Sequence, residues 1–568
     1  MEFCRLARAA LCGAMLTGPG LGAQAAGATA GDELLGLWGA EPMLGPQVRG
    51  GLWLERQEGR WTMRVGGFEA SAAQQGDSVR IALPGGQGTL RLWTTGAVPE
   101  AYWIQPAGLG ASFAVPVLLR AAGPHAWRGV VAPIDPGFPL YLMVTREADA
   151  ALRGTFRNPS HNWPGRAPFF GVALDGETVT FTHPKTGKVQ WRQPFDPAQR
   201  TITFDFGGPI VLSPRTPEQA VGFVPRSPAL PPYRYRAPLD LGDGWAVGWA
   251  VGGAAQATMD PGALQAIVRD LAQADPASPS ALRVDSLLVA HGGRLVLEEY
   301  FRGQAPDVPH DLRSASKTMT SIMVGAAIQH GASLSSRSTL PGAPITLGHL
   351  LSHSSGLACD DDDGDSPGNE DTMQAQSAQP DWYAYFKALP KLREPGQAYV
   401  YCSAGINMVG QMLGSATGLW LPRLFDQYLA RPLQFSRYGI NLMPTGEAYS
   451  GGGMHLLPRD FLKFGQLYLD GGRWQGKQLV SPAWIRESTA HRIARPGGSD
   501  DGLGWHRHRM TLGSRTVQAF EASGNGGQFL FVVPELKLAV VVTAGQYGDP
   551  GWSRIRQELI PAVLRAVR

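Results

Sequence analysis

The stretch HDLRSASKTMTSIMVG, residues 310–325, decides how this chain is interpreted. It contains the sequence Ser314-Ala-Ser-Lys317, followed by apolar residues at helical spacing, so it predicts a helix that begins near Ser314. Residues three apart share a face of a helix, which would place Lys317 beside the hydroxyl of Ser314. A serine hydroxyl is a weak nucleophile until a neighbour takes its proton, and a lysine can help when burial lowers its pKa. The stretch therefore predicts an activated serine, although the same spacing also occurs on ordinary surface helices.

The composition restricts the class of protein. A chain of 568 residues is too long for one hydrophobic core, so at least two domains are expected. Charged residues make up 17% of the chain and glycine is abundant, which is typical of a folded, loop-rich, partly β protein. The net charge is only +3 and the sequence has no basic run. Nucleic acid is therefore not expected as a partner.

The first 25 residues have the pattern of a secretory signal peptide. Arg5 and Arg8 give the positive start, residues 9–16 the apolar middle, and Ala23-Gln-Ala25 a small-residue cleavage site. The apolar run is too short to span a membrane, and we expect no transmembrane segment in the mature chain. The pattern predicts a periplasmic or secreted protein.

Cysteine usage fits this compartment. Cys4 and Cys12 lie in the predicted signal peptide, which leaves Cys359 and Cys402 in the mature chain. Two cysteines in an oxidising compartment favour a single disulfide between them, and two buried free thiols are the alternative.

The rest of the chain divides into two parts. Residues 32–225 predict a β-rich N-terminal domain, a sandwich or a barrel, because short alternating runs are separated by Gly, Pro and Asp turns. A Pro-rich stretch, residues 226–244, is the expected linker. Residues 245–568 begin and end with strand patterns around a helical middle, which predicts an α+β domain. The N-terminal tryptophans are expected in the core instead of on a carbohydrate-binding surface; they are Trp38, Trp53, Trp61, Trp93, Trp103 and Trp127.

Six blocks of the C-terminal part carry a family resemblance. They are LLVAHGGRLVLEEYF (287–301), HDLRSASKTMTSIMVG (310–325), ITLGHLLSHSSGL (345–357), PGQAYVYCSAGINMVG (395–410), GGGMHLLPRDFLKFGQLYLDGG (451–472) and ASGNGGQFLFVVPELKLAVVVT (522–543). In this order they resemble the serine hydrolases related to class C β-lactamases and penicillin-binding proteins, a group that includes esterases, D-amino-acid peptidases and linear-amide hydrolases. The resemblance implies a β-lactamase/transpeptidase-like fold, in which helices and a helical subdomain flank an antiparallel sheet. The N-terminal domain lies outside it.

The resemblance also implies the catalytic residues. The family's nucleophile and lysine fall on Ser314 and Lys317, and its Tyr-x-Asn or Tyr-x-Ser motif falls on Tyr401-Cys402-Ser403. A phenol beside an ammonium ionises more readily, so Tyr401 could take the proton of Ser314 and pass it to the leaving group. An oxyanion hole is implied from the backbone N–H of Ser314 and one from the strand near Gln528. The candidate substrate and oxyanion residues are Ser403, Ser523, Gly524, Asn525, Gly527 and Gln528.

This sequence departs from the family pattern at the third motif. The family often has Lys-Thr-Gly or His-x-Gly on the strand that lines the site, and this chain has Ala522-Ser523-Gly524 at the corresponding place. A cation that could hold a substrate carboxylate is missing there. This favours an ester or an uncharged amide over a β-lactam or a peptidoglycan peptide. A Lys-Thr-Gly sequence at residues 185–187 lies in a predicted hairpin turn, and we interpret it as a coincidence.

Two patterns could suggest metals. His349 and His353 have the spacing of zinc ligands on a helix, but no Glu follows His349 and no third ligand is evident. The acidic run at residues 360–371 lacks the spacing of a calcium-binding hand, and it is interpreted as a solvated loop at the rim of the site. Neither a metal nor another cofactor is expected.

Together these patterns predict a serine hydrolase that works through an acyl-enzyme and acts on a small-molecule ester or amide, with small esters as the first choice. Amidase, D-amino-acid peptidase or β-lactamase activity is the alternative among enzymes. A penicillin-binding-like sensor without turnover is the alternative from another class. No pattern in the sequence specifies an oligomeric state.

Overall fold

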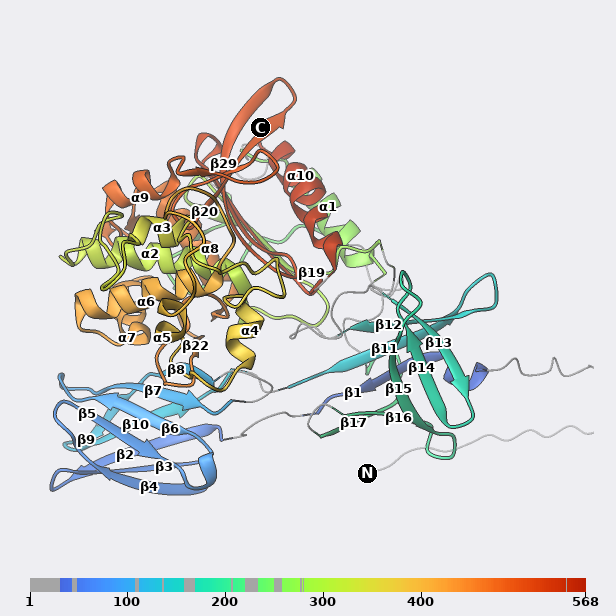
Figure 1. Ribbon diagram of the computed structural model, residues 1–568, viewed down its shortest axis with the longest axis horizontal. Helices are drawn as coiled ribbons and strands as arrows, with labels where there is room; N and C mark the ends of the chain where they lie inside the picture. Colours follow the sequence, from blue (N-terminus) through green and yellow to red (C-terminus); the bar gives the residue numbers. More distant parts are fainter. Residues whose placement is uncertain are drawn as a thin grey trace, which may run out of the picture.

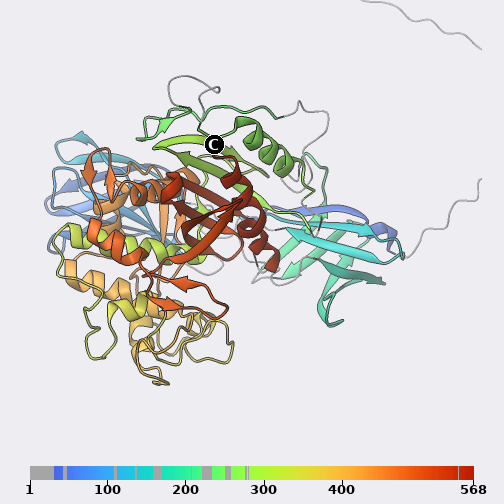
Figure 2. The same cartoon turned by 90° about the horizontal axis from the view of Figure 1, so that it is seen from above.

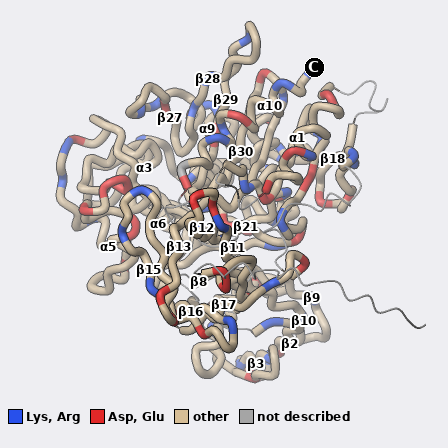
Figure 3. The backbone as a smooth tube through the Cα atoms, turned by 90° about the vertical axis from the view of Figure 1, so that its right-hand side faces the viewer, with Lys and Arg blue, Asp and Glu red and all other residues tan. Residues whose placement is uncertain are grey.

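The computed structural model describes residues 31–42, 48–107, 112–134, 137–157, 169–205, 208–219, 233–249, 258–275, 278, 280–547 and 549–568. The predicted signal peptide and part of the predicted linker lie outside these residues. Within them the chain forms a β-barrel, a pair of facing sheets and a large body with both helices and strands (Figure 1). No helix of this described part is long and apolar enough to cross a membrane. Basic and acidic residues are interspersed along the chain (Figure 3), in keeping with the low net charge.

The barrel is closed and has the strand order β1-β11-β12-β13-β14-β15-β16-β17. Its strands are β1 (Gly36–Ala40), β11 (Leu140–Arg146), β12 (Leu152–Arg157), β13 (Phe170–Asp175), β14 (Thr178–Thr182), β15 (Val189–Asp196), β16 (Thr201–Asp205) and β17 (Pro209–Pro214). Pairing of β1 with β17 closes the ring, which removes exposed strand edges. The Lys-Thr-Gly sequence at 185–187 is exposed in the turn between β14 and β15, as expected for a hairpin.

The pair of facing sheets is built from the strands between β1 and β11. A five-stranded sheet has the order β4-β3-β2-β10-β9, and β5 to β8 belong to a second sheet of seven strands. The bounds are β2 (Gly50–Gln57), β3 (Arg60–Val65), β4 (Phe68–Ala73), β5 (Ser78–Ala82), β6 (Thr89–Trp93), β7 (Glu100–Gln105), β8 (Ser112–Val117), β9 (Arg120–Gly123) and β10 (Ala126–Val131). Residues 32–225 therefore hold two β bodies, with one inserted between the first and second strands of the other. Strand patterns reveal the strands but not which of them pair.

The expected burial of the N-terminal tryptophans is found at five of the six positions. Trp38 lies in the barrel core, Trp61, Trp103 and Trp127 lie between the two sheets, and Trp93 is buried against the large body. Trp53 is the exception, because it is partly exposed on the five-stranded sheet.

The seven-stranded sheet joins the N-terminal half to the large body. β8 pairs with β22 (Tyr438–Leu442), β22 pairs with β23 (His455–Leu456), and β23 pairs with β21 (His310–Asp311). This hydrogen-bonded ladder ends directly before the predicted nucleophile, Ser314. The two halves of the chain therefore share one sheet, with β7 and β8 lying directly under β22 in Figure 1.

Hydrogen bonds and ring stacking between side chains stabilise this junction. Tyr102 of β7 donates to Asp426 over 3.1 Å, and Tyr438 donates to the same carboxylate over 2.8 Å. Trp93 stacks on Trp420 with ring centroids 5.5 Å apart. Tyr102 and Trp93 belong to the same hydrophobic core cluster as the helices around the predicted site.

The large body is organised on a nine-stranded sheet with the order β18-β20-β19-β31-β30-β29-β28-β27-β26. Its strands are β18 (Ala246–Val247), β19 (Val284–His291), β20 (Arg294–Tyr300), β26 (Ile493–Ala494), β27 (Asp500–Asp501), β28 (His506–Leu512), β29 (Arg515–Gly524), β30 (Gln528–Val533) and β31 (Leu538–Ala544). β19 from the start of the body pairs antiparallel with β31 from its end, which confirms the predicted α+β fold. A short ribbon of β24 (Arg473–Trp474) and β25 (Lys477–Gln478) lies outside this sheet.

Both faces of this sheet are covered. In β30, Phe529, Phe531 and Val533 face one core, whereas Leu530 and Val532 face the other, as the two-residue period of a strand requires. Helices α1 (Pro261–Gln273) and α10 (Ile560–Arg565) contribute to the first core, and α2 (Ser316–Gln329) and α8 (Pro458–Leu469) contribute to the second. Figure 2 shows α1 and α10 together on one side. The remaining α-helices are α3 (Leu347–Leu351), α4 (Glu370–Ala375), α5 (Trp382–Lys387), α6 (Ser403–Thr417), α7 (Leu421–Phe425) and α9 (Pro482–Thr489).

Candidate active site

Ser314 lies in a tight turn at the start of α2. The turn is one of 3-10 helix, Arg313–Ala315, and it leads directly into α2, so the predicted helix start is confirmed to within two residues. Arg313 has a φ of 48°, a left-handed conformation that is uncommon outside glycine. Its backbone N–H donates to Asp311 over 2.8 Å, which holds this turn in place. The Ser314 side chain remains partly accessible.

The helix that follows is buried on all sides, although its pattern suggested one apolar face. Every residue from Ser316 to Ala327 is buried. Its hydroxyl groups are satisfied by loop carbonyls: Thr318 donates to Gly504 over 2.6 Å, and Thr320 donates to Ser450 over 2.7 Å. Buried polar groups need such partners, and these bonds fix the helix in the interior.

The three predicted catalytic residues come together. The Nζ of Lys317 lies 3.0 Å from the Oγ of Ser314, so the predicted contact is confirmed. The same Nζ lies 4.9 Å from the ring centroid of Tyr401, which comes from the segment just before α6. Two segments that are distant in sequence thus meet at the amino group of Lys317.

The charge of Lys317 differs from the sequence-based expectation. Burial favours the neutral amine, but attraction to Tyr401, Glu370 and Asp361 outweighs burial and raises the pKa of Lys317 above its ordinary value. The lysine is therefore an ammonium at neutral pH. As an ammonium it can donate to Ser314 and stabilise negative charge nearby, but it cannot take a proton.

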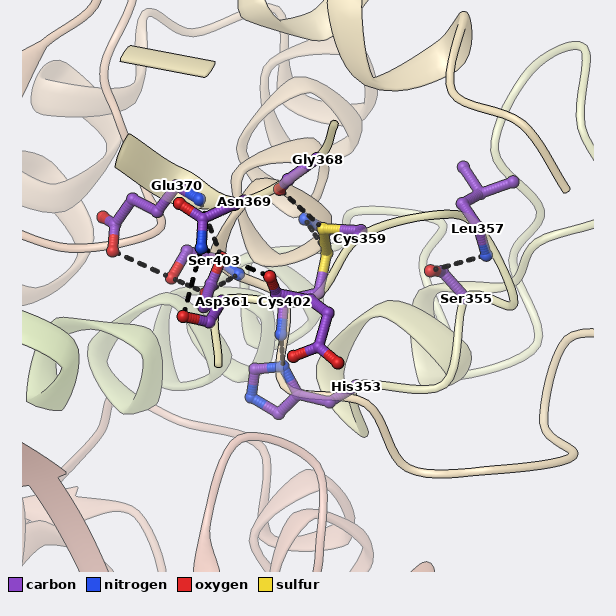
Figure 4. The surroundings of a disulfide bond; sticks show 12 residues. His353, Ser355, Leu357, Cys359, Asp361, Gly368, Asn369, Glu370, Cys402 and Ser403 are labelled. Carbon is purple, nitrogen blue, oxygen red and sulfur yellow. Dashed lines mark hydrogen bonds between the residues drawn. A yellow bond between two sulfur atoms is a disulfide. The ribbon is translucent and has the colours of Figure 1, made fainter. Parts of the chain in front are cut away.

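Two carboxylates that the sequence analysis assigned to a solvated rim belong to this site. Asp361 and Glu370 both lie near Ser403 (Figure 4), and neither is exposed. The Oδ2 of Asp361 accepts from the backbone N–H and from the hydroxyl of Ser403, each over 2.7 Å. Burial raises the pKa of Asp361, and Lys317 opposes that shift. The interpretation of residues 360–371 as a uniformly solvated loop is wrong at these two positions.

A sequence signal for these carboxylates was present. Asp361 lies two residues after Cys359, and Ser403 directly follows Cys402. The predicted disulfide between the two cysteines is found in the structure, with their Cα atoms 5.4 Å apart. Combining the disulfide with the Tyr401 motif would have placed Asp361 beside the site.

Reducing this disulfide is expected to lower kcat/KM by about 10-fold or more, since displacing a catalytic group by about 1 Å can cost on the order of 10²-fold. The bridge fixes Cys402, the residue next to Tyr401. Hydrolysis would be measured before and after reduction and alkylation of folded protein. A variant with both Cys359→Ala and Cys402→Ala controls for direct effects of the reagents. Full activity of the reduced, alkylated wild type would contradict this role.

The predicted site residues at the end of β29 and the start of β30 fall into two groups. Gly524, at the end of β29, lies directly against the nucleophile turn, because a Cβ there would overlap the carbonyl oxygen of Leu312 and approach the backbone nitrogen of Ala315 to 3.1 Å. Ser523 and Asn525, on either side of it, are partly exposed. This end of the strand fits the predicted role, since only glycine allows so close an approach.

Three other predicted site residues are buried and contact the protein itself. The amide of Gln528 is buried and donates to the carbonyl of Ala544 over 2.6 Å. Gly527 packs against Ile555. Ser403 is fully buried, and its hydroxyl is used by Asp361. The geometry gives these three residues supporting positions, which a motif pattern could not distinguish from contact with substrate.

The two histidines with zinc-like spacing have structural partners. The Nδ1 of His349 accepts from the backbone of Thr346 over 3.2 Å at the start of α3. The Nδ1 of His353 accepts from the N–H of Cys402 over 3.1 Å, and its ring lies 4.6 Å from that of Tyr401. Burial lowers the pKa of His353 to about 3, so it is a neutral support for Tyr401.

Chelation by EDTA is expected to leave hydrolysis unchanged. No group of three or more metal-binding side chains gathers in the part of the chain that the structure describes. In the acidic loop, the amide of Asn369 already donates to the carbonyls of Asp360, Asp361 and Asp363 over 3.1 to 3.3 Å. Activity would be assayed after EDTA treatment and dialysis. Loss that calcium restores would contradict this prediction.

Comparison with known proteins agrees with this geometry. The model of the Beta-lactamase family matches residues 264–559, which is more than half of the chain. A 6-aminohexanoate-dimer hydrolase from Paenarthrobacter ureafaciens is 27% identical over 312 residues, covering 50% of this chain and 78% of that protein.

Two solved structures are also similar. A putative 6-aminohexanoate-dimer hydrolase from Bacillus anthracis has 18% identity and a TM-score of 0.42, covering 50% of this chain and 81% of that one. A family VIII carboxylesterase has 18% identity and a TM-score of 0.43, covering 54% and 95%. Given the family match over more than half of its length, this chain belongs to the Beta-lactamase family and is a serine hydrolase of ester or amide bonds.

Proposed function

We propose that this protein is an esterase that hydrolyses small, uncharged esters through an acyl-enzyme on Ser314. The observation that carries this proposal is the 3.0 Å contact between Lys317 and Ser314, with Tyr401 beside the same ammonium. The absence of a cation in Ala522-Ser523-Gly524 supports an uncharged substrate, since a substrate carboxylate would have no partner at that motif.

In the first half of the reaction, Tyr401 acts as the base. Because Lys317 is held as an ammonium, it cannot be the base, and we assign the acceptance of the Ser314 proton to the oxygen of Tyr401 beside it. The Oγ of Ser314 then forms a bond to the carbonyl carbon of the ester. As the tetrahedral intermediate collapses, the bond to the alcohol oxygen breaks and Tyr401 returns the proton to the leaving alkoxide.

The second half repeats these roles with water. Water attacks the acyl carbon while its proton passes to Tyr401, and the bond to Ser314 breaks as that proton returns to Oγ. We assign stabilisation of the oxyanion to the backbone N–H of Ser314 and to the end of β29 around Gly524, which lies against the nucleophile turn.

An amidase acting on a linear amide is the second candidate. Its support is the likeness to a 6-aminohexanoate-dimer hydrolase at 27% identity. The same acyl-enzyme would form, but Tyr401 would have to protonate an amine instead of an alcohol.

A fluorophosphonate probe combined with a substrate panel tests the proposal. Intact mass should show one adduct on wild type and none on Ser314→Ala. The panel comprises p-nitrophenyl acetate and butyrate, a p-nitroanilide, 6-aminohexanoate dimer and nitrocefin. Turnover of the two esters above the others supports an esterase, and preference for the dimer supports the amidase. A stable adduct with no turnover of any substrate would favour the sensor, and no adduct on folded wild type would contradict an activated Ser314.

We also propose that the protein works outside the cytoplasm. The signal-like pattern of residues 1–25 and the disulfide between Cys359 and Cys402 both suit an oxidising compartment. Mass analysis of the exported protein should show a new N-terminus after Ala25. Full-length protein retained in the cytoplasm would contradict this proposal.

A further inference from the structure

The acidic loop contains two carboxylates with defined partners close to the catalytic lysine. Glu370 accepts from the hydroxyl of Tyr449 over 2.6 Å and from that of Ser403 over 3.3 Å. Asp361 accepts from Ser403, and its Oδ1 also accepts from the N–H of Glu370 over 2.9 Å. In Figure 4 these side chains converge on Ser403. Because their oxygens are occupied by protein donors, they are better suited to shape the site than to bind a substrate.

The backbone around these carboxylates is fastened to the Tyr401 segment. The disulfide joins Cys359 to Cys402, and the N–H of Asp361 donates to the carbonyl of Tyr401 over 2.9 Å. The Asn369 amide closes the loop on itself through three carbonyls. A loop that only shielded the site would not need this many anchors to one catalytic residue.

Three groups act on the ammonium of Lys317: Tyr401 from the segment before α6, and Glu370 and Asp361 from the acidic loop. The ring of His353 lies 4.6 Å from that of Tyr401, and His353 is neutral because burial lowers its pKa. Glu370 also acts on the guanidinium of Arg313 and helps to raise its pKa. Besides Tyr401, the two carboxylates are therefore the groups whose negative charge opposes the burial of the lysine.

We propose that Asp361 and Glu370 are positioning residues of this hydrolase, which fix the segment of Tyr401 and Ser403 beside Lys317 and whose charges favour the ammonium of that lysine. This inference rests on the proposed acyl transfer by Ser314. It adds that a loop outside the Ser-x-x-Lys motif, tied to the Tyr401 segment by a disulfide, contributes to the charge of the lysine.

These charges should affect how kcat/KM depends on pH. Burial lowers the pKa of Lys317, but Tyr401 and then the two carboxylates raise it above its ordinary value, so the site loses its ammonium only in the alkaline range. Removing one negative charge lowers that pKa, because burial is then less opposed. The alkaline limb of kcat/KM should therefore move to lower pH, by about one unit for each carboxylate removed.

The experiment compares variants that change charge at matched positions. Asp361→Asn and Glu370→Gln remove one charge each and keep one oxygen acceptor, while an amide NH2 replaces the second oxygen. Asp362→Asn removes the same charge from the next residue, which is exposed, and serves as the control. Asp361→Glu tests whether restoring the charge restores the profile. Thermal melts would confirm that each variant is folded.

The readouts are kcat, KM and the rate of fluorophosphonate labelling of Ser314, each as a function of pH. We expect the alkaline limb of both rates to shift in Asp361→Asn and Glu370→Gln, with kcat falling more than KM changes, and no shift in Asp362→Asn. If wild type is labelled and the folded variants keep the same alkaline limb as wild type, the inference is overturned and the proposed function still stands. Folded wild type that is never labelled would instead refute the proposed function, and the inference with it.

Discussion

Ser314→Ala is expected to lower kcat by roughly 10⁴-fold or more while the protein remains folded. Ser314 is a partly exposed residue in the turn before α2, and its hydroxyl receives a hydrogen bond from Lys317. Alanine keeps the backbone of this turn and removes only the nucleophile. Hydrolysis of p-nitrophenyl butyrate, with thermal unfolding as a check on the fold, measures the effect.

A double variant tests whether Ser314 and Lys317 act as one unit. Residues that act as one unit have non-additive effects, so Ser314→Ala with Lys317→Met should be no less active than Ser314→Ala alone. Lys317→Met by itself should also be severely impaired, because the ammonium beside Tyr401 is lost. Residual activity above about 10% in folded Ser314→Ala would mean that another group performs the attack. The same result in folded Lys317→Met would mean that the ammonium is not required.

Deleting the N-terminal half is expected to leave a chain, residues 233–568, that does not fold into soluble hydrolase. β22 would lose its partner β8 and become an exposed edge, which promotes aggregation. Trp93 and Tyr102 would leave the core cluster that surrounds the site. Asp426 would lose one of its two tyrosine donors at a buried position. Expression, gel filtration and labelling of Ser314 by fluorophosphonate would test this.

A single substitution measures how much one hydrogen bond between the two halves contributes to stability. Tyr102→Phe keeps the ring but removes the hydroxyl that donates to Asp426, which should lower the free energy of unfolding by about 1–3 kcal/mol. Tyr385→Phe is the matched control, because that hydroxyl donates to the Pro367 carbonyl at an exposed position. A monomeric 233–568 chain that unfolds cooperatively and reacts with the probe would show that the halves are independent.

Local sequence patterns were enough to identify the catalytic pair. The spacing of Ser314 and Lys317 specifies a shared helix face whatever the rest of the chain does, and the structure has them in contact. Strand patterns in residues 245–568 likewise predicted a sheet built from both ends of the domain, as the pairing of β19 with β31 shows. The two cysteines outside the predicted signal peptide left one possible intramolecular disulfide between them, which is the one found.

The charge of the lysine and the pairing of the two halves were decided only in three dimensions. Whether Lys317 is neutral depends on its burial and on the groups around it, Tyr401, Glu370 and Asp361, and Coulomb energies follow distance in space, not position in the chain. A motif also cannot say which groups a side chain bonds, and only the fold shows that the Gln528 amide bonds Ala544 and that the Ser403 hydroxyl bonds Asp361. The pairing of β8 with β22 joins segments of two predicted domains, and strand periodicity contains no information about the partner of an edge strand.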